Sequence, residues 1–452
     1  MGFKEIKRNK KLHLLAAAIF ILISLFAFFT PLLLWDENAY LGNARSHLGP
    51  SNFTEDFRFP LLEWFITLIW IFGESILAAR FLIILFAIGT IYLVYVISKS
   101  FFDKDAFLIA FFYSLSFPFL FWSSKIYTEV PSLFLVLLSF YFLTKESKKE
   151  TMNFTLAGAF AGIAFLFKFP LALFALSVGL FLLYRKEFKK TFVFSSAFLI
   201  VLMPWLAINY IYHGNPIWDF YEQYKIVAQY TRWQPISFGI KNLFYSLGAM
   251  LALLPIGLFS FAIRKDKWNK LVVLYVSITL FYFLFFVNMK DIRYFFYILP
   301  FMIIIAFDAI RIAKKLNIKK TDINKILKGI MILSALISLI YSISVIYGYY
   351  HCDNNSAILQ EIDYLKDKTN TNDTLLSNHW PWLGYYLNTK VASIWSSDAK
   401  ELISTYNPKY FIVNDKIGDP IDTSMFNQTN IQLEKVFLGA CGEKSSVYLV
   451  KQ

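Results

Sequence analysis

The sequence predicts a polytopic α-helical membrane protein of about eleven transmembrane helices with a small C-terminal extracytoplasmic α/β domain. Three observations predict this class. The 452 residues are 57% hydrophobic and 17% charged, whereas a soluble domain carries roughly 25% charged residues. The apolar residues form long runs, and about 20 apolar residues in a helix cross a bilayer. The composition turns polar after residue 350. These observations exclude a large soluble enzyme.

Eleven apolar runs are the predicted transmembrane helices. The first follows a basic stretch and lacks a small-residue cleavage site, so we interpret it as a retained signal anchor. Residues 61–72 are apolar but too short to cross, which predicts a re-entrant or interfacial helix. In chain order the runs lie at 13–34, 77–98, 106–122, 130–144, 152–167, 170–184, 191–212, 243–263, 270–288, 294–311 and 328–350.

The basic residues indicate the orientation of the chain. The net charge of +13 could suggest nucleic acid, but the basic residues gather in short clusters between apolar runs, so we expect no nucleic-acid partner. The clusters fall on alternate loops, and Lys/Arg-rich loops stay in the cytoplasm. We therefore predict a multi-pass protein of the cell membrane with a cytoplasmic N-terminus. The loops at 35–76 and 213–241 and the C-terminal domain would be extracytoplasmic.

The polar segment 351–452 is predicted to be a second domain after a membrane domain of residues 1–350. Its two cysteines, Cys352 and Cys441, would lie in an oxidising compartment, where they either form a disulfide or stay as buried thiols. Alternating helices and strands are typical of a small α/β domain. The pattern predicts helix 357–368, strand 374–377, helices 382–387 and 398–405, strand 410–413 and two last strand-like runs ending at 447–450.

Charged residues of both signs stand at the predicted outer ends of the apolar runs. A single charge there is usually an interfacial anchor. Several together predict a site, because ionisable groups this deep usually face an interior cavity. The residues are Asp36, Glu37, Glu129, Lys168, Lys290 and Arg293.

The residue types indicate group transfer from a lipid-linked phosphate. Cations at the membrane surface suit a phosphate, which Arg binds bidentately, and a nearby carboxylate can accept a proton from a hydroxyl. The sequence has no Walker-type phosphate loop, no Cys-x-x-Cys pair and no His-Glu-x-x-His helix. His379, beside Trp380, is predicted to be a structural hydrogen-bonding residue.

Five motifs in this order resemble those of the GT-C glycosyltransferases, in particular the protein O-mannosyltransferase-like branch with the lipid A aminoarabinose transferases. The resemblance covers about residues 10–350, and the tail is similar to the outer domain of prokaryotic members. The motifs are Trp35-Asp36-Glu37 with Tyr40 and Arg45, Arg58-Phe-Pro-Leu, Tyr127-Thr-Glu129, Gly162 through Lys168-Phe-Pro, and Lys290-Asp-Ile-Arg293-Tyr294.

The resemblance implies an inverting transferase that moves a monosaccharide from a polyprenyl- or dolichyl-phosphate donor to an acceptor hydroxyl outside the membrane. Asp36 would be the general base, and Glu37 and Glu129 would position the acceptor or sugar. The donor phosphate would bind Arg58, Lys168, Lys290 and Arg293. Acceptor and sugar contacts would come from Tyr40, Arg45, Tyr127 and Tyr294.

Cofactors, partners and alternatives complete the prediction. We expect no cofactor and no metal site, because Phe57 stands where related transferases carry a metal-binding Glu; a divalent metal stays open. The partners would be a lipid-linked sugar donor, membrane lipids and a glycan, lipid or protein acceptor. A secondary transporter or lipid flippase is the alternative, and a membrane-anchored binding protein that acts through its tail is another.

Overall fold

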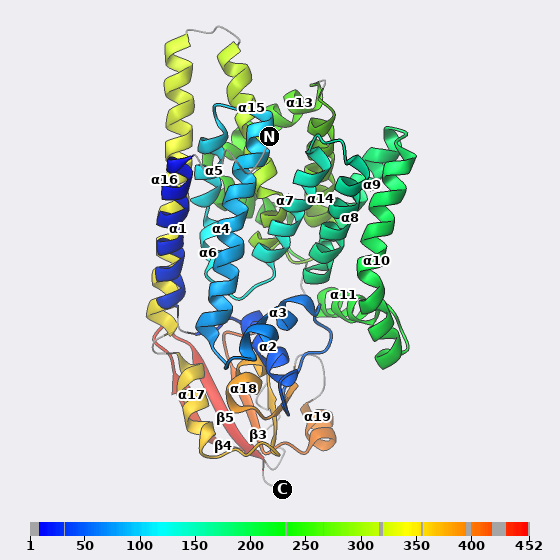
Figure 1. The fold of residues 1–452 in the computed structure, drawn as a ribbon. Coiled ribbons are helices and arrows are strands. Elements are labelled where there is room, and N and C mark those ends of the chain that lie inside the picture. Colours follow the sequence, from blue (N-terminus) through cyan, green and yellow to red (C-terminus); the bar gives the residue numbers. More distant parts are fainter. Residues whose placement is uncertain are drawn as a thin grey trace. The chain divides into compact units, whose positions relative to one another are not determined.

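The structure is a computed structural model that describes residues 9–30, 32–230, 233–264, 266–315, 320–353, 356–394, 399–417 and 431–450. It is mainly helical (Figure 1). The chain divides into two compact units, each made of two chain segments. We call Met1–Leu25 with Phe81–Ser344 the helical unit, and Phe26–Arg80 with Val345–Gln452 the mixed unit.

The predicted transmembrane runs fall on helices. Within the described residues, eight helical stretches are long and apolar enough to cross a membrane, and a bent pair can be a ninth. The eight stretches fall on α1 (Lys10–Phe28), α4 (Ile76–Phe101), α8 (Glu150–Phe167), α10 (Phe188–His213), α12 to α13 (Ile236–Leu247, Leu254–Ala262), α14 (Lys267–Phe285), η4 and most of α15 (Ile292–Ile298, Leu299–Lys315) and most of α16 (Lys320–Asp353).

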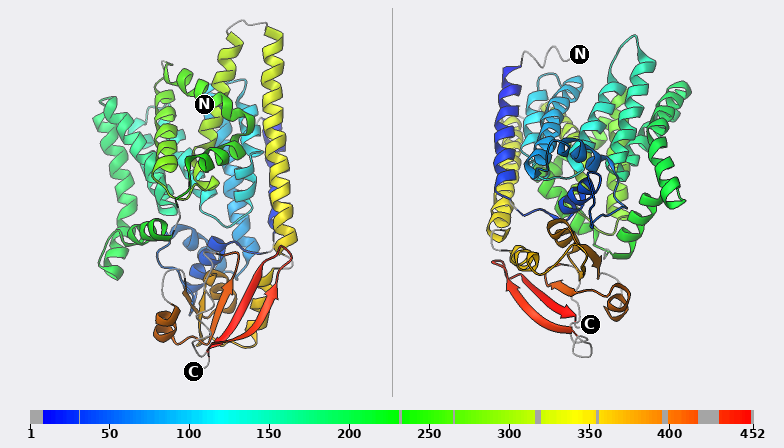
Figure 2. Two further views of the ribbon diagram at one scale, coloured as in Figure 1. Left: turned by 180° about the vertical axis from the view of Figure 1, so that it is seen from behind. Right: turned by 60° about the horizontal axis from the view of Figure 1, so that its bottom comes forward.

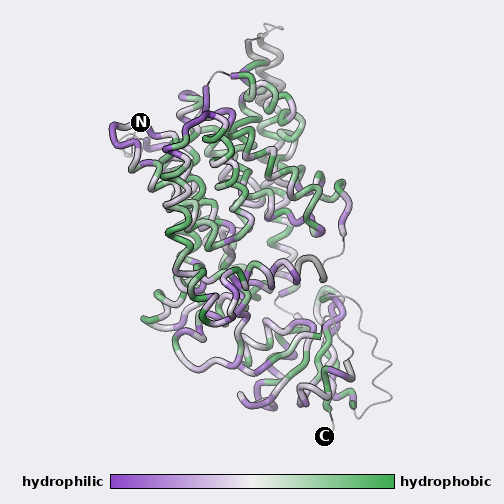
Figure 3. The backbone as a smooth tube through the Cα atoms, turned by 90° about the vertical axis from the view of Figure 1, so that its right-hand side faces the viewer, coloured by the Kyte–Doolittle hydropathy of each residue, from purple (hydrophilic) through white to green (hydrophobic). Residues whose placement is uncertain are grey.

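The remaining predicted runs are shorter or broken helices. The bent pair is α5 (Ala106–Ser114) and α6 (Phe117–Ser123), which meet at 59°. Pro118 stands in the first turn of α6, where the fixed φ of proline starts a helix but cannot continue the previous one. The two shorter helices are α7 (Glu129–Thr144) and η2 with α9 (Phe169–Leu171, Ala172–Tyr184). Hydrophobic residues predominate along the helices of the helical unit (Figure 3).

The first outer loop differs from its prediction. The first helix ends at Phe28, not at residue 34, and the next helix, α2 (Trp35–Ser46), begins at Trp35. Leu32 and Leu33 lengthened the apolar run in the sequence, but both are buried, and Leu32 packs in the core of the C-terminal domain. The predicted short helix is present as α3 (Leu61–Trp70).

The predicted loop 213–241 is also largely helical. Gly214, with φ +68°, ends α10 in the left-handed conformation that glycine adopts without strain. Helix α11 (Trp218–Tyr230) follows, and the His213 and Trp218 rings stack 3.7 Å apart between centroids. Its tyrosines and tryptophan therefore lie on a helix, because their spacing is helical and no proline interrupts them.

The C-terminal domain is an α/β domain, as predicted. Its five-stranded sheet has the order β2-β1-β3-β5-β4, with β1 parallel to β2 and β3 and with β5 antiparallel to β3 and β4. Figure 2 shows β4 and β5 side by side. The elements are α17 (Ala357–Lys366), β1 (Thr374–Ser377), α18 (Trp380–Leu387), β2 (Lys390–Ser393), α19 (Ala399–Tyr406), β3 (Tyr410–Asn414), β4 (Ile431–Leu438) and β5 (Lys444–Val450).

Strand β2 was missing from the prediction, because Lys390-Val-Ala-Ser has little apolar alternation. Residue 398, predicted to start a helix, lies outside the described residues.

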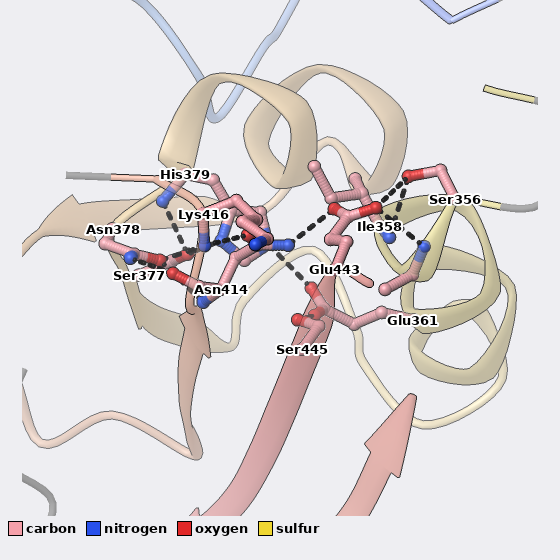
Figure 4. A network of polar contacts seen from close by, with 11 residues as sticks. Ser356, Ile358, Glu361, Ser377, Asn378, His379, Asn414, Lys416, Glu443 and Ser445 are labelled. Atoms are coloured by element: carbon pink, nitrogen blue, oxygen red, sulfur yellow. Dashed lines mark hydrogen bonds and ion pairs between the residues drawn. The ribbon is translucent and has the colours of Figure 1, made fainter. Parts of the chain in front are cut away.

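Two internal links hold this domain. Cys352 and Cys441 form a disulfide, which decides between the two alternatives that the sequence left open. His379 is fully buried, and its Nε2 lies 2.9 Å from Glu361 Oε1 while Nδ1 lies 3.0 Å from Ser377 Oγ (Figure 4). Ser445 also donates to Glu361. The predicted structural role of His379 is confirmed.

Candidate active site

Helix α2 places the first pair of predicted carboxylates. Leu34, in an extended conformation, caps the helix, and the Glu37 side chain accepts a hydrogen bond of 2.8 Å from its backbone N–H. Asp36 and Glu37 both lie in the first turn, where the helix dipole stabilises negative charge. The Trp35-Asp36-Glu37 motif, predicted to lie in an outer loop, therefore forms the N-terminus of a helix.

Arg58 joins two carboxylates in the mixed unit. Its Nη1 donates to Asp36 Oδ1 at 3.0 Å and its Nε donates to Glu55 Oε2 at 2.6 Å, with all three side chains largely buried. The Tyr40 ring lies 5.1 Å from the guanidinium carbon. Burial disfavours the charge, but Glu55 and Asp36 outweigh it and raise the pKa of Arg58. The guanidinium is thus held ionised beside Asp36.

Trp380 of the C-terminal domain contacts the same group and was missed in the sequence. Its Nε1–H donates to Glu55 Oε1 at 2.7 Å, and its ring lies 4.6 Å from that of Trp35. The Trp-Pro-Trp triplet in a polar tail was the available signal, since exposed tryptophans in a small domain often mark a contact. No local pattern connects this triplet to Glu55.

Glu37 and Arg45 make contacts that organise the mixed unit. The Glu37 side chain is fully buried and lies 3.7 Å from Arg80, which also donates to the carbonyls of Ala27 and Thr30 at the end of α1. Arg45 pairs with Glu74 and donates to the Tyr385 carbonyl at 2.7 Å. Both side chains therefore hold α2 in place.

Glu129 and Lys168 form an ion pair in the helical unit. Lys168 Nζ lies 3.1 Å from Glu129 Oε1, and Glu129 is fully buried at the start of α7. The Tyr297 hydroxyl donates to the same oxygen at 3.3 Å. The prediction missed Tyr297, although it stands three residues after Tyr294 in the motif. Two distant motifs meet at this carboxylate.

The turn before η4 orients the remaining predicted cations. Asp291 caps η4, accepts from the Arg293 N–H at 3.0 Å and lies 3.1 Å from Arg293 Nε. The Lys290 ammonium donates to the Val287 carbonyl; Lys290 is 1% exposed, and burial lowers its pKa. The Arg293 guanidinium carbon lies 5.6 Å from the Tyr294 ring, and Lys168 is close enough to act electrostatically on the Tyr294 hydroxyl.

The predicted residues therefore form two groups, one in each unit. The mixed-unit group contains Asp36, Tyr40 and Arg58, with Glu37 and Arg45 supporting α2. In the helical unit, Glu129 contacts Lys168, while Arg293 and Tyr294 adjoin in η4; Tyr127 is buried with its ring 4.8 Å from that of Trp122. No three metal-ligating side chains gather among the described residues.

Comparisons with known proteins agree on one fold. The family model of dolichyl-phosphate-mannose-protein mannosyltransferases matches residues 58–209. No curated protein matches the sequence. The chain is similar to the crystal structure of ArnT from Cupriavidus metallidurans bound to undecaprenyl phosphate, with a TM-score of 0.68 at 11% identity. The alignment covers 96% of this chain and 97% of the ArnT chain.

A second solved relative is the oligosaccharyltransferase of Archaeoglobus fulgidus in its apo form. It has a TM-score of 0.56 at 11% identity, over 88% of this chain and 69% of its own. The mycobacterial arabinofuranosyltransferase AftD has a TM-score of 0.55 at 11% identity, over 98% of this chain and 40% of its own. These likenesses show that this chain shares its fold with the three solved proteins.

Proposed function

We propose that this chain, a glycosyltransferase of the GT-C fold, transfers a monosaccharide from a polyprenyl- or dolichyl-phosphate donor to an acceptor hydroxyl outside the membrane. The observation that carries the proposal is the contact between Asp36 and Arg58, 3.0 Å apart. It joins a carboxylate suited to accept a proton with a guanidinium suited to bind a phosphate. The match to ArnT bound to undecaprenyl phosphate supports the lipid carrier.

The proposed reaction is a single displacement with inversion. Asp36 accepts the proton of the acceptor hydroxyl as its oxygen bonds to the anomeric carbon. The bond from that carbon to the phosphate oxygen breaks on the opposite face, and the lipid phosphate leaves with the electron pair. Arg58 stabilises the charge that grows on the phosphate, and the sequence prediction gives Lys168 and Arg293 of the helical unit the same role. The reaction as proposed uses no metal.

Donor binding and release of the base are coupled in this proposal. Arg58 already donates to Asp36 and Glu55, and its other N–H groups are the ones we assign to the phosphate. A phosphate that draws the guanidinium toward it frees Asp36 Oδ1 for the acceptor hydroxyl. The base then becomes available when the donor is bound.

We infer roles for the other predicted residues from the contacts of their charged groups. Glu37, Arg45 and Lys290 are positioning residues, because buried or structural contacts occupy their charged groups. Glu129 orients Lys168 toward the donor. Tyr40 and Tyr294 adjoin Arg58 and Arg293, and with Tyr127 they contact the sugar or acceptor.

The test is transfer from a synthetic polyprenyl-phosphate monosaccharide by purified protein in detergent. General-base catalysis contributes roughly 10²–10⁴-fold, so Asp36→Asn should lower kcat by at least about 100-fold and leave donor affinity near normal. Asp103→Asn, an equal change at an exposed side chain, is the matched control. Full turnover by Asp36→Asn would overturn the base assignment, and activity lost in a chelator would overturn the metal-free mechanism.

A further inference from the structure

A pocket with several polar lining residues lies on the side of the helical unit that the basic clusters predict to be cytoplasmic. It has a volume of about 430 Å³ and lies in the helical unit, between the end of α4, the α13–α14 connection and the end of α15. We call it the Arg264–Arg311 pocket after its two cations. Its other polar lining residues include Ser100, Ser260, Asp266 and Asn269.

Both arginines of the pocket approach the same phenylalanine ring. Their guanidinium carbons lie 5.5 Å (Arg264) and 5.9 Å (Arg311) from the same Phe102 ring. Burial and the charge of Arg311 together lower the pKa of Arg264. The two arginines carry like charges in one pocket, and a bound anion would reduce their repulsion.

The nearby carboxylates already have partners. Asp308 is fully buried and bonds to Arg264 and to the Ser260 hydroxyl. Asp266 caps α14 by accepting from the Trp268 N–H at 2.9 Å. Arg311, in contrast, is exposed, and within the described part of the chain it forms no ion pair. In the described part of the chain, Arg264 is therefore paired with Asp308, whereas the Arg311 guanidinium can bind a ligand.

Asn269 is the independent sign of a ligand. Asn269 is 1% exposed, and neither its amide nitrogen nor its amide oxygen has a hydrogen-bond partner among the described residues. It lines the pocket from the first turn of α14. Burying an unpaired amide is unfavourable, and a ligand with oxygen atoms would satisfy the amide nitrogen.

We propose that the Arg264–Arg311 pocket binds a phosphate group through Arg311, the Asn269 amide and the pocket hydroxyls. Guanidinium and amide donors around a small polar cavity suit a tetrahedral oxyanion. Two sources carry this chemistry on the predicted cytoplasmic side: the headgroup of an anionic phospholipid, which this leaflet supplies, and soluble phosphate. The pocket contains none of the residues proposed for sugar transfer.

The test uses the full-length protein with two probes. Lipids retained from nanodiscs of phosphatidylcholine, with or without phosphatidylglycerol, are measured by native mass spectrometry. Inorganic phosphate is titrated against thermal stability, with chloride at equal ionic strength as the reference. Retention of phosphatidylglycerol supports the lipid source, and stabilisation by phosphate supports the soluble one.

Three variants decide the assignment. Arg311→Gln should weaken binding of the effective probe about tenfold, as expected for one charge-assisted hydrogen bond. Asn269→Asp should weaken it at least as much, because it places a negative charge in the pocket. Lys148→Gln removes a charge from an exposed residue of the same predicted side and should change nothing. The proposal is overturned if neither probe binds, or if Arg311→Gln binds as well as Lys148→Gln.

Discussion

Asp36 and Glu37 are adjacent, yet their carboxylates meet different surroundings. Asp36 faces Arg58 with part of its side chain still exposed, whereas the Glu37 side chain is fully buried against Leu34 and Arg80. A residue that must accept a proton from a substrate needs access to it, and a residue that caps a helix does not. The pair therefore divides into a proposed base and a positioning residue.

Glu37→Gln is expected to lower the stability of the fold more than the rate of sugar transfer. The amide can still accept from Leu34 but leaves the buried Arg80 without its charged partner, which should cost about 1–3 kcal/mol of unfolding free energy. Thermal denaturation in detergent measures this cost. Asp36→Asn, the same change one residue earlier, should keep the melting temperature and lose turnover. If Glu37→Gln kept full stability and lost turnover equally, Glu37 would be catalytic.

The pair of Glu129 and Lys168 gives a second prediction for single residues. Lys168→Met leaves the fully buried Glu129 carboxylate without its cation, so the unfolding free energy should fall by about 3–5 kcal/mol. Adding Glu129→Gln removes that charge and should restore much of the stability, without restoring transfer.

Thermal shift and transfer assays of the single and double variants check this pair. Lys168→Arg, which keeps the cation, serves as the control. A double variant as unstable as Lys168→Met would show that the ion pair is not the source of the loss.

At the scale of elements, α18 contacts the proposed donor site through one hydrogen bond. Trp380 Nε1–H holds Glu55, and Glu55 holds Arg58. Gly384 of α18 permits a close approach to Phe53, because a Cβ there would come within 2.1 Å of the Phe53 ring. The C-terminal domain therefore helps to set the position of the guanidinium.

Trp380→Phe is expected to weaken donor binding. Phenylalanine keeps the ring contact with Trp35 but loses the hydrogen bond to a buried carboxylate, so the donor KM should rise about 3- to 10-fold with a smaller change in kcat. Steady-state kinetics with varied donor check this expectation. Tyr406→Phe, on exposed α19, is the control. An unchanged donor KM would separate Trp380 from the function of Arg58.

At the scale of the molecule, the disulfide between Cys352 and Cys441 ties the end of α16 to the turn between β4 and β5, 89 residues apart. A cross-link over a long loop restricts the unfolded chain. Its presence also agrees with the predicted extracytoplasmic place of the C-terminal domain, because disulfides persist in oxidising compartments.

Removing this disulfide should destabilise the mixed unit. Cys352→Ser combined with Cys441→Ser is expected to lower its unfolding free energy by about 2–4 kcal/mol. Urea denaturation followed by limited proteolysis of the C-terminal domain measures the change, with the unaltered protein under reducing conditions as the control. Equal urea midpoints would mean that the core and sheet hold the domain without the cross-link.

Much of the fold could be predicted because its causes are local. Apolar runs and basic clusters locate the membrane helices, since the bilayer imposes both patterns on the chain. The helices and most strands of the C-terminal domain follow from alternation. The first apolar run was predicted too long because Leu32 and Leu33 are hydrophobic for a protein core and not for the lipid.

Sequence alone determined the protein class, the order of its elements and the residue types of the candidate site. Only the tertiary structure decided which charges pair: Arg58 with Asp36 and Glu55, Lys168 with Glu129, and Glu37 with Arg80. It also brought Trp380 and Tyr297 to carboxylates far away in the chain. The physical reason is that hydrophobic patterning acts over neighbouring residues, whereas a buried ion pair depends on which distant side chains the folded chain brings within about 4 Å.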